Sequence, residues 1–235
     1  IHRGDRFTTL VAMDTESFFG KDFVEKKTGK ECKDFRNGDH TTTLMRTAKG
    51  KVVEIQHNVM TPQPYNRLFK LTGTKGYATK YPTPEYALSG DALKGTDAPQ
   101  MDNLNAHGFM NAAQKQALEK KYYHPILTKY GEKGREMGHG GMDYIMDARL
   151  VYCLQNGLPL DMDVYDMAEW CSLAELGAIS MDNNCAAVTF PDFTRGYWNK
   201  QQGYKHAYAP AEEEAKTEAA ADAYTAAQKK VTADF

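Results

Sequence analysis

Residues 41–59 read TTTLMRTAKGKVVEIQHNV, and this stretch decides the fold that the sequence predicts. Two runs rich in β-branched and apolar residues, 41–46 and 52–59, flank a short polar segment that contains Gly50. Glycine reaches positive φ without strain, so Gly50 can supply the turn between two antiparallel strands. The stretch therefore predicts a β-hairpin.

Two other regions predict further antiparallel strands. Residues 6–15 are apolar and β-branched, which is typical of a strand. Residues 68–71 and 77–80 flank a turn between Gly73 and Gly76, so they repeat the order of short strand, glycine turn and strand. The first third of the chain therefore predicts an antiparallel meander, with polar, turn-rich sequence between its first strand and the hairpin.

The second half of the chain changes to helical patterns. Residues 82–108 contain several prolines and glycines without a steady period, so they are expected to form a long surface loop. Apolar residues then recur near helical spacing over 111–130, where Pro125 must end or kink the helix. The same spacing predicts helices over 142–154 and 164–180.

Strands precede helices along the chain, and this order predicts the fold class. After the helices, residues 188–190 predict one last short strand. This separation of strands from helices along the chain indicates an α+β domain, which is an open and mainly antiparallel β-sheet with helices on one face. We expect this domain to cover residues 1–205. The tail at 206–235 is rich in Ala and Glu and lacks a wide apolar stripe, so it is expected to be helical or frayed.

The composition fits a folded domain and excludes two classes of partner. Of the 235 residues, 41% are hydrophobic and 11% aromatic, enough for a substantial core. The net charge of −2 gives no general attraction to nucleic acid or to anionic membranes. No apolar run reaches the roughly 18 residues that span a bilayer. We therefore expect no nucleic-acid partner and no membrane span.

The densest group of unusual residues reads GHGGMDY at 138–144. Its glycines let the backbone approach a ligand closely, and His139 and Asp143 lie where a helix is expected to begin. Such a place suits an anion or a sugar hydroxyl. A second interpretation stays open, in which the stretch is a flexible helix entry and His139 only caps or packs.

Two further groups place polar side chains in turns. Residues 61–67 read TPQPYNR, in which prolines stiffen a loop that presents Tyr65 and Asn66. A phenol held in this way can bind a ligand or act as an acid, although a packed tyrosine is commoner. Residues 159–166 carry three aspartates without the glycine and terminal glutamate of a calcium loop, so these are expected to cap a helix and face solvent. The four cysteines have no CxxC spacing, and no metal site is expected.

Several familiar catalytic motifs are missing from the sequence. No stretch matches GxGxxG after a strand, a P-loop, a GxSxG elbow or HExxH. We therefore expect no cofactor-binding residues in this chain, and the residues alone predict only part of a functional site.

A set of ordered motifs resembles one known family. The set comprises GHGGMDY at 138–144, LPLDMDVYD at 158–166, PDFTRGYW at 191–198, the Pro64-Tyr65-Asn66 loop and FKLTGTKG at 69–76. Over roughly residues 4–200, they resemble glycoside hydrolase family 109, the NAD-dependent α-N-acetylgalactosaminidases of the Gfo/Idh/MocA oxidoreductase superfamily.

The resemblance implies a two-domain enzyme of which this chain is the second part. An N-terminal Rossmann domain, absent from this chain, would bind NAD, and the C-terminal domain would supply much of the sugar pocket. This domain is expected to be clipped, with the catalytic Tyr and His lying before Ile1. Tyr65 falls on the family's substrate-binding tyrosine, and His139 and Asp143 are expected near the pocket.

The resemblance also implies a reaction. NAD would oxidise the 3-hydroxyl of a terminal α-linked N-acetylgalactosamine, the glycoside would leave by elimination, water would add and the hydride would return. Two alternatives stay open: a sugar oxidoreductase of the same superfamily, and a non-catalytic sugar-binding or oligomerisation module.

The partners implied by the resemblance are a carbohydrate substrate, the Rossmann domain, and a second copy of the chain joined through the open sheet, whose exposed side needs a cover. The residues themselves indicate no compartment. The resemblance is compatible with an exported or periplasmic bacterial protein.

Overall fold

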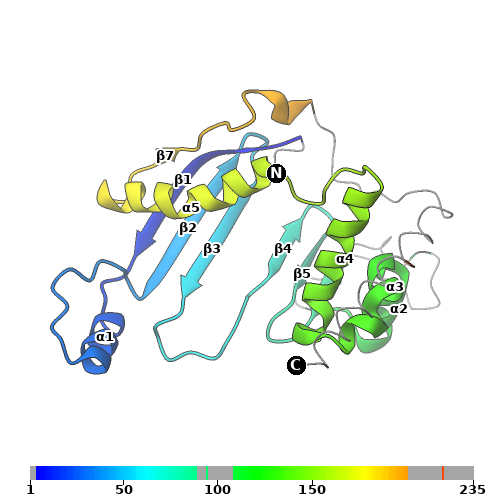
Figure 1. Cartoon of the computed structure of the whole chain (residues 1–235), viewed down its shortest axis with the longest axis horizontal. Helices are drawn as coiled ribbons and strands as arrows, with labels where there is room; N and C mark the ends of the chain where they lie inside the picture. The colour runs from blue at the N-terminus through cyan, green and yellow to red at the C-terminus, as the bar shows by residue number, and fades with distance from the viewer. Residues whose placement is uncertain (1–3, 89–93, 95–107, 201–218, 220–235) are drawn as a thin grey trace. The chain divides into compact units, whose positions relative to one another are not determined.

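Figure 1 shows a computed structural model of the chain, which describes residues 4–88, 94, 108–200 and 219. The chain divides into two compact units, residues 1–62 with 150–235, and residues 63–149. The described strands form two antiparallel sheets accompanied by helices, so the predicted α+β class is confirmed.

The expectation of a single open sheet was wrong, because the strands divide into a four-stranded and a three-stranded sheet. The division falls between the third and fourth strands, where the chain carries Pro62 and Pro64. Proline has no backbone N–H to donate to a ladder, so this segment interrupts the meander.

The first unit contains the four-stranded sheet. Its strands, in order across the sheet, are β3 (Val52–Asn58), β2 (His40–Thr47), β1 (Phe7–Asp14) and β7 (Val188–Thr189). The predicted hairpin is confirmed: Leu44 pairs with Glu54, and Gly50 adopts a φ of 79° in the turn. The strands predicted over 6–15 and 188–190 are β1 and β7.

One helix covers this sheet. In Figure 1, α5 (Val164–Asp182) is the long yellow helix that crosses β1. The helix packs on β1 at Gly177, where an added Cβ would make an ordinary van der Waals contact with the Cβ of Ala12 at 3.7 Å. The buried residues of this core come from β1, β2, α5 and the segment after β7, and they are Phe7, Leu10, Ala12, Met45, Leu176 and Phe190.

A serine on α5 completes the hydrogen bonds of β1 where β7 ends. The edge strand β7 pairs with β1 only at Thr9 and Leu10. Beyond that point the N–H of Ala12 donates to Ser180 Oγ at 3.0 Å. The hydroxyl of Ser180 in turn donates to the carbonyl of Ala186 at 2.7 Å. Ser180 is fully buried, so a side chain replaces the missing strand partner.

The helix α1 (Gly20–Thr28) corrects the expectation of turns after β1. The side chain of Asp39 accepts hydrogen bonds from the backbone N–H groups of Phe18, Phe19 and Gly20, at 2.7 to 2.8 Å. Burial alone would raise the pKa of Asp39, but these hydrogen bonds outweigh it and lower the pKa. The helix was missed because its capping carboxylate comes from the start of the next strand rather than from a local N-cap.

The second unit contains the smaller sheet. Its strands are β4 (Lys70–Gly73), β5 (Gly76–Thr79) and β6 (Glu85–Leu88), in that order. The predicted pair of strands is β4 and β5, whereas β6 lies inside the stretch 82–108 that was expected to be a loop. This strand has the sequence EYAL and directly follows Pro82 and Pro84. Four residues are too few to show the alternating pattern of a strand, so the sequence did not predict it.

The helices predicted over 142–154 and 164–180 are confirmed, whereas the helical region predicted over 111–130 extends to residue 135. Pro125 divides the helix expected over 111–130 into α2 (Ala112–Tyr122) and α3 (Pro125–Arg135), as its ring requires. The remaining elements are η2 (Gly138–Gly141), α4 (Met142–Gln155), α5 and η3 (Tyr197–Asn199). None of the described helices combines the length and apolar character needed to cross a bilayer. Apart from residue 219, the tail at 206–235 lies outside the described residues.

The aspartates at 159–166 have a structural role. Asp163 caps α5 by accepting from the N–H of Tyr165 at 2.9 Å, and the side chain of Asp166 accepts from the N–H of Asp163 at 3.0 Å. The predicted capping is therefore confirmed. The expectation that all three face solvent was wrong for Asp166, which is buried.

Candidate functional site

Tyr65 lies on the loop between β3 and β4 and exposes 73% of its surface. Its hydroxyl accepts a hydrogen bond from Nε of Arg67. The Arg67 guanidinium also lies 5.7 Å from the centre of the Tyr65 ring. The rings of Tyr65 and Tyr81 meet edge-on, with their centres 6.5 Å apart. The phenol is therefore held on two sides while its hydroxyl hydrogen remains available to a ligand.

The neighbouring amide of Asn66 serves the loop itself. Its Oδ1 accepts from the N–H of Leu68 at 2.6 Å, and Leu68 has a φ of 38°. This local bond is typical of Asn in turns. The structure thus assigns Asn66 to shaping the loop that presents Tyr65.

A second candidate is the pair formed by His139 and Asp143. Nδ1 of His139 lies 2.5 Å from Oδ2 of Asp143, and both side chains are exposed. The hydrogen bond with Asp143, helped by the negative charge of the carboxylate, raises the pKa of His139. Asp143 therefore favours the charged imidazolium and fixes the ring through Nδ1.

The backbone at this pair is unusual. His139, Gly140 and Gly141 have φ values of 56°, 65° and 90°, three consecutive residues in the left-handed region. Such a conformation is unfavourable for His139, because a side chain in this region crowds the backbone. These three residues form the turn between α3 and α4.

Close contact between two glycines fixes this turn. A Cβ on Gly141 would lie 2.5 Å from the carbonyl carbon of Gly134, at the end of α3. The ring of Tyr130 on α3 also meets the ring of Tyr144 on α4, edge-on at 6.3 Å. The end of α3 and the start of α4 thus hold His139 and Asp143 in place.

The described contacts leave the two candidate groups separate. Tyr65 contacts Arg67 and Tyr81, whereas His139 contacts Asp143, and no described hydrogen bond or ring contact joins the two groups. Sequence reasoning located both groups. It missed Arg67 and Tyr81, although the position of Arg67 two residues after Tyr65 was a signal.

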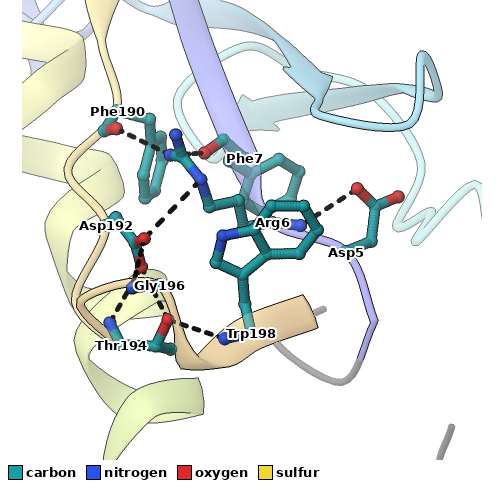
Figure 2. A network of polar contacts seen from close by, with 8 residues as sticks. All are labelled: Asp5, Arg6, Phe7, Phe190, Asp192, Thr194, Gly196 and Trp198. Carbon is teal, nitrogen blue, oxygen red and sulfur yellow. Dashed lines mark hydrogen bonds and ion pairs between the residues drawn. The ribbon is translucent and has the colours of Figure 1, made fainter. Parts of the chain in front are cut away.

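A third family motif has a structural role (Figure 2). Within PDFTRGYW, the side chain of Asp192 accepts from the N–H groups of Thr194 at 3.0 Å and Gly196 at 2.8 Å. Arg6 lies beside this loop, with Nε 3.9 Å from Asp192 and Nη1 2.9 Å from the carbonyl of Phe7. Burial alone would raise the pKa of Asp192, but hydrogen bonds, chiefly from Thr194, and the charge of Arg6 lower it. The loop therefore closes on the start of β1.

The described residues show no site for a metal or a dinucleotide. Among them, no three His, Cys, Asp or Glu side chains gather as metal ligands. Each strand pair of the two described sheets is antiparallel, so this part of the chain has no parallel βαβ unit with a glycine-rich turn.

The fold and the site define an α+β domain with an exposed, supported phenol and a histidine–carboxylate pair. The family model for the glycosyl hydrolase 109 C-terminal domain matches residues 1–200. The chain belongs to this family.

Curated relatives extend the comparison. The chain is 84% identical over 233 residues to glycosyl hydrolase family 109 protein 3 of Phocaeicola vulgatus, covering 99% of the chain and 42% of that protein. It is 58% identical over 210 residues to glycosyl hydrolase family 109 protein 1 of Bacteroides thetaiotaomicron, covering 89% of the chain and 45% of that protein. The chain thus spans less than half the length of these relatives.

Proposed function

We propose that this chain is the substrate-side domain of an NAD-dependent glycoside hydrolase that removes terminal α-linked N-acetylgalactosamine. Family membership carries this proposal, since the relatives are named glycosyl hydrolases. The exposed and oriented Tyr65 supports it further, because a phenol can hydrogen-bond a sugar hydroxyl while its ring packs on the sugar.

In this proposal Tyr65 binds and orients the sugar. Arg67 donates to the phenol oxygen, so the phenol hydrogen points away from Arg67 and can be donated to a sugar oxygen. Contact with the Tyr81 ring limits the orientations of the phenol. A fixed hydrogen-bond donor lowers the entropy lost when the sugar binds.

The cofactor would lie outside this chain. NAD would supply reversible hydride transfer with the sugar, and a domain of the complete enzyme other than this one would hold it. The antiparallel pairing of the described strands supports the proposal that another domain holds NAD, because a Rossmann domain needs parallel strands. The residues of this chain would bind and orient the sugar.

An aryl α-N-acetylgalactosaminide tests the proposed activity. With the complete enzyme we expect net release of the phenol while NAD is regenerated in each cycle. Accumulation of NADH in proportion to product would instead identify a sugar oxidoreductase. Release of neither product would contradict both enzyme proposals and leave the binding module.

Changing Tyr65→Phe in the complete enzyme should lower kcat/KM for this substrate by about 5-fold, since one hydrogen bond to a neutral group contributes about 1 kcal/mol. The affinity for NAD should stay unchanged. Steady-state kinetics and a cofactor titration measure the two quantities. Tyr123→Phe is the control, because Tyr123 is also exposed, at 54%. Equal kinetics for wild type and Tyr65→Phe would remove Tyr65 from the site.

The chain is also proposed to self-associate through its four-stranded sheet. The sheet face opposite α5 carries Met13, Leu44 and Val52, which expose 60%, 46% and 66% of their surfaces. Sedimentation velocity should show a concentration-dependent dimer that Leu44→Lys abolishes. The introduced ammonium group would lie opposite Glu54, so the strand pair should tolerate the change. A monomer at every concentration, or a dimer unaffected by the change, would contradict this interface.

A further inference from the structure

The sequence around Tyr65 is basic, although the chain as a whole is slightly acidic, with a net charge of −2. Residues 55–84 contain no Asp or Glu, and their cations are Arg67, Lys70, Lys75 and Lys80. The acidic residue that follows this stretch is Glu85, and its Oε2 is paired with Nζ of Lys115 at 3.1 Å. The positive charge of the stretch therefore has no counter-charge within its own sequence.

Two of these cations lie against aromatic rings beside the candidate substrate-binding phenol. Nζ of Lys80 lies 5.6 Å from the centre of the Phe69 ring and 5.9 Å from the centre of the Tyr81 ring. The Tyr81 ring in turn meets the Tyr65 ring, whose centre is 5.7 Å from the Arg67 guanidinium. Arg67 and Lys80 therefore both contact one aromatic cluster, which consists of Tyr65, Phe69 and Tyr81.

The hairpin of β4 and β5 places Lys80 in this cluster. The N–H of Lys80 donates to the carbonyl of Phe69 at 2.9 Å, one position beyond the paired strands. The two residues are therefore opposite each other at the open end of the hairpin, where their side chains are neighbours. Lys75 lies in the turn at the far end of the same hairpin.

Neither cation has an anionic partner in the part of the chain that the structure describes. The ion pairs of the described residues include neither Arg67 nor Lys80. Arg67 uses Nε for its hydrogen bond to the Tyr65 oxygen, which leaves the N–H groups of both Nη atoms for a ligand. These groups match the oxygens of a carboxylate or a sulfate ester. An aromatic face attracts a cation without neutralising it, so Lys80 can also bind an anion.

We propose that Arg67 and Lys80 form an anion-binding subsite, and that the bound sugar carries a sulfate ester or a carboxylate that fills it. This inference rests on the proposed glycosidase function. Arg67 contacts the Tyr65 hydroxyl directly, so an anion on Arg67 lies within reach of the sugar that Tyr65 binds. The proposed reaction uses carbons 1, 2 and 3 of that sugar, which leaves carbons 4 and 6 for the anionic group. The substrate class is therefore an α-N-acetylgalactosaminide with a negative charge on carbon 4 or 6.

The first test gives the complete enzyme a set of aryl α-N-acetylgalactosaminides. One is neutral, and the others carry a 4-sulfate, a 6-sulfate or a carboxylate at carbon 6. At least one charged substrate should have a kcat/KM about 10-fold above that of the neutral one, as charge-assisted hydrogen bonds provide. This preference should decrease at high salt, because salt screens exposed charges. A kcat/KM for every charged substrate that is equal to or below that of the neutral one would contradict the subsite.

Variants that remove single charges assign the preference to these residues. Lys80→Gln should lower the ratio of kcat/KM for the charged substrate to that for the neutral one, and Lys80→Gln combined with Arg67→Gln should abolish the preference. The ratio cancels any effect of Arg67→Gln on the orientation of Tyr65, since both substrates meet it. Lys75→Gln is the matched control, because it removes the same charge from the far end of the hairpin, and it should keep the ratio. Circular dichroism melts confirm that each variant folds. A preference that survives in the double variant, or that Lys75→Gln reduces as much as Lys80→Gln, would contradict the assignment.

A binding measurement separates this inference from the proposed function. In calorimetric titrations of the complete enzyme, N-acetylgalactosamine with a 4-sulfate, a 6-sulfate or a carboxylate at carbon 6 should bind about 10-fold more tightly than the neutral sugar, for at least one of the three. An enzyme that shows this binding but cleaves none of the glycosides contradicts the proposed function and retains the anion subsite. An enzyme that cleaves the neutral glycoside and shows no preference for charge contradicts the subsite alone. Binding to vesicles of anionic phospholipid that Lys80→Gln weakens, without a preference among the sugars, would assign the cations to a membrane surface and overturn the proposal.

Discussion

Replacing Gly141 by alanine should lower the free energy of unfolding by about 3 kcal/mol, or roughly 6–12 °C in Tm. Gly141 has a φ of 90°, and a Cβ there would lie 2.5 to 2.7 Å from the main-chain atoms of Gly134. The left-handed conformation contributes about 1 kcal/mol of this cost and overpacking about 2 kcal/mol. Thermal denaturation followed by circular dichroism measures the change.

The neighbouring glycine gives a matched control. Gly140 has a φ of 65°, but nothing lies within 4 Å of a Cβ built on it. Gly140→Ala should therefore lower the free energy of unfolding by about 1 kcal/mol, the cost of the left-handed conformation alone. Equal melting temperatures for the two variants would mean that the contact between Gly134 and Gly141 does not hold the turn.

Replacing Ser180 by alanine should cost about 2–3 kcal/mol of unfolding free energy. The change leaves the buried N–H of Ala12 and the carbonyl of Ala186 without the partner that Ser180 provides. A buried donor that loses its acceptor retains the full cost of leaving water. Chemical denaturation, followed by the fluorescence of the two tryptophans, measures this difference.

Ser172 on the same helix supplies the comparison. Its hydroxyl donates to the carbonyl of Glu169 in the preceding turn and is only half-buried. Ser172→Ala should change the unfolding free energy by less than about 0.5 kcal/mol, because the helix keeps its own hydrogen bonds. A Ser180→Ala variant as stable as Ser172→Ala would contradict the role of Ser180 in completing β1.

Local patterns predicted the parts of the fold that local interactions determine. The β2–β3 hairpin depends on alternating side chains and on Gly50, which all lie within one stretch. Pro125 ends a helix through its own ring, and Asp163 caps α5 from the adjacent position. Each of these signals lies within a few residues of the structure it determines.

The parts that the sequence did not predict depend on distant partners. The helix α1 needs the carboxylate of Asp39, which is 19 residues from Gly20. The separation of the strands into two sheets and the pairing of β6 with β5 are long-range choices that periodicity does not encode.

The same distinction applies to the candidate site. Tyr65, His139 and Asp143 were recognisable because unusual residues surround them in the sequence. The ring of Tyr81 beside Tyr65 was not, because the two residues meet only through the fold. The PDFTRGYW motif carried the family resemblance, yet the structure gives its Asp192 a loop-closing role that sequence could not separate from ligand binding.

A calorimetric titration of NAD tests the central claim most directly. The claim is that this chain is the substrate-side domain of an enzyme whose cofactor is held elsewhere. The titration is made into this chain and, in parallel, into the full-length Phocaeicola vulgatus relative that is 84% identical to it. We expect saturable binding by the full-length protein and none by the chain. Saturable binding of NAD by the chain itself would contradict the account.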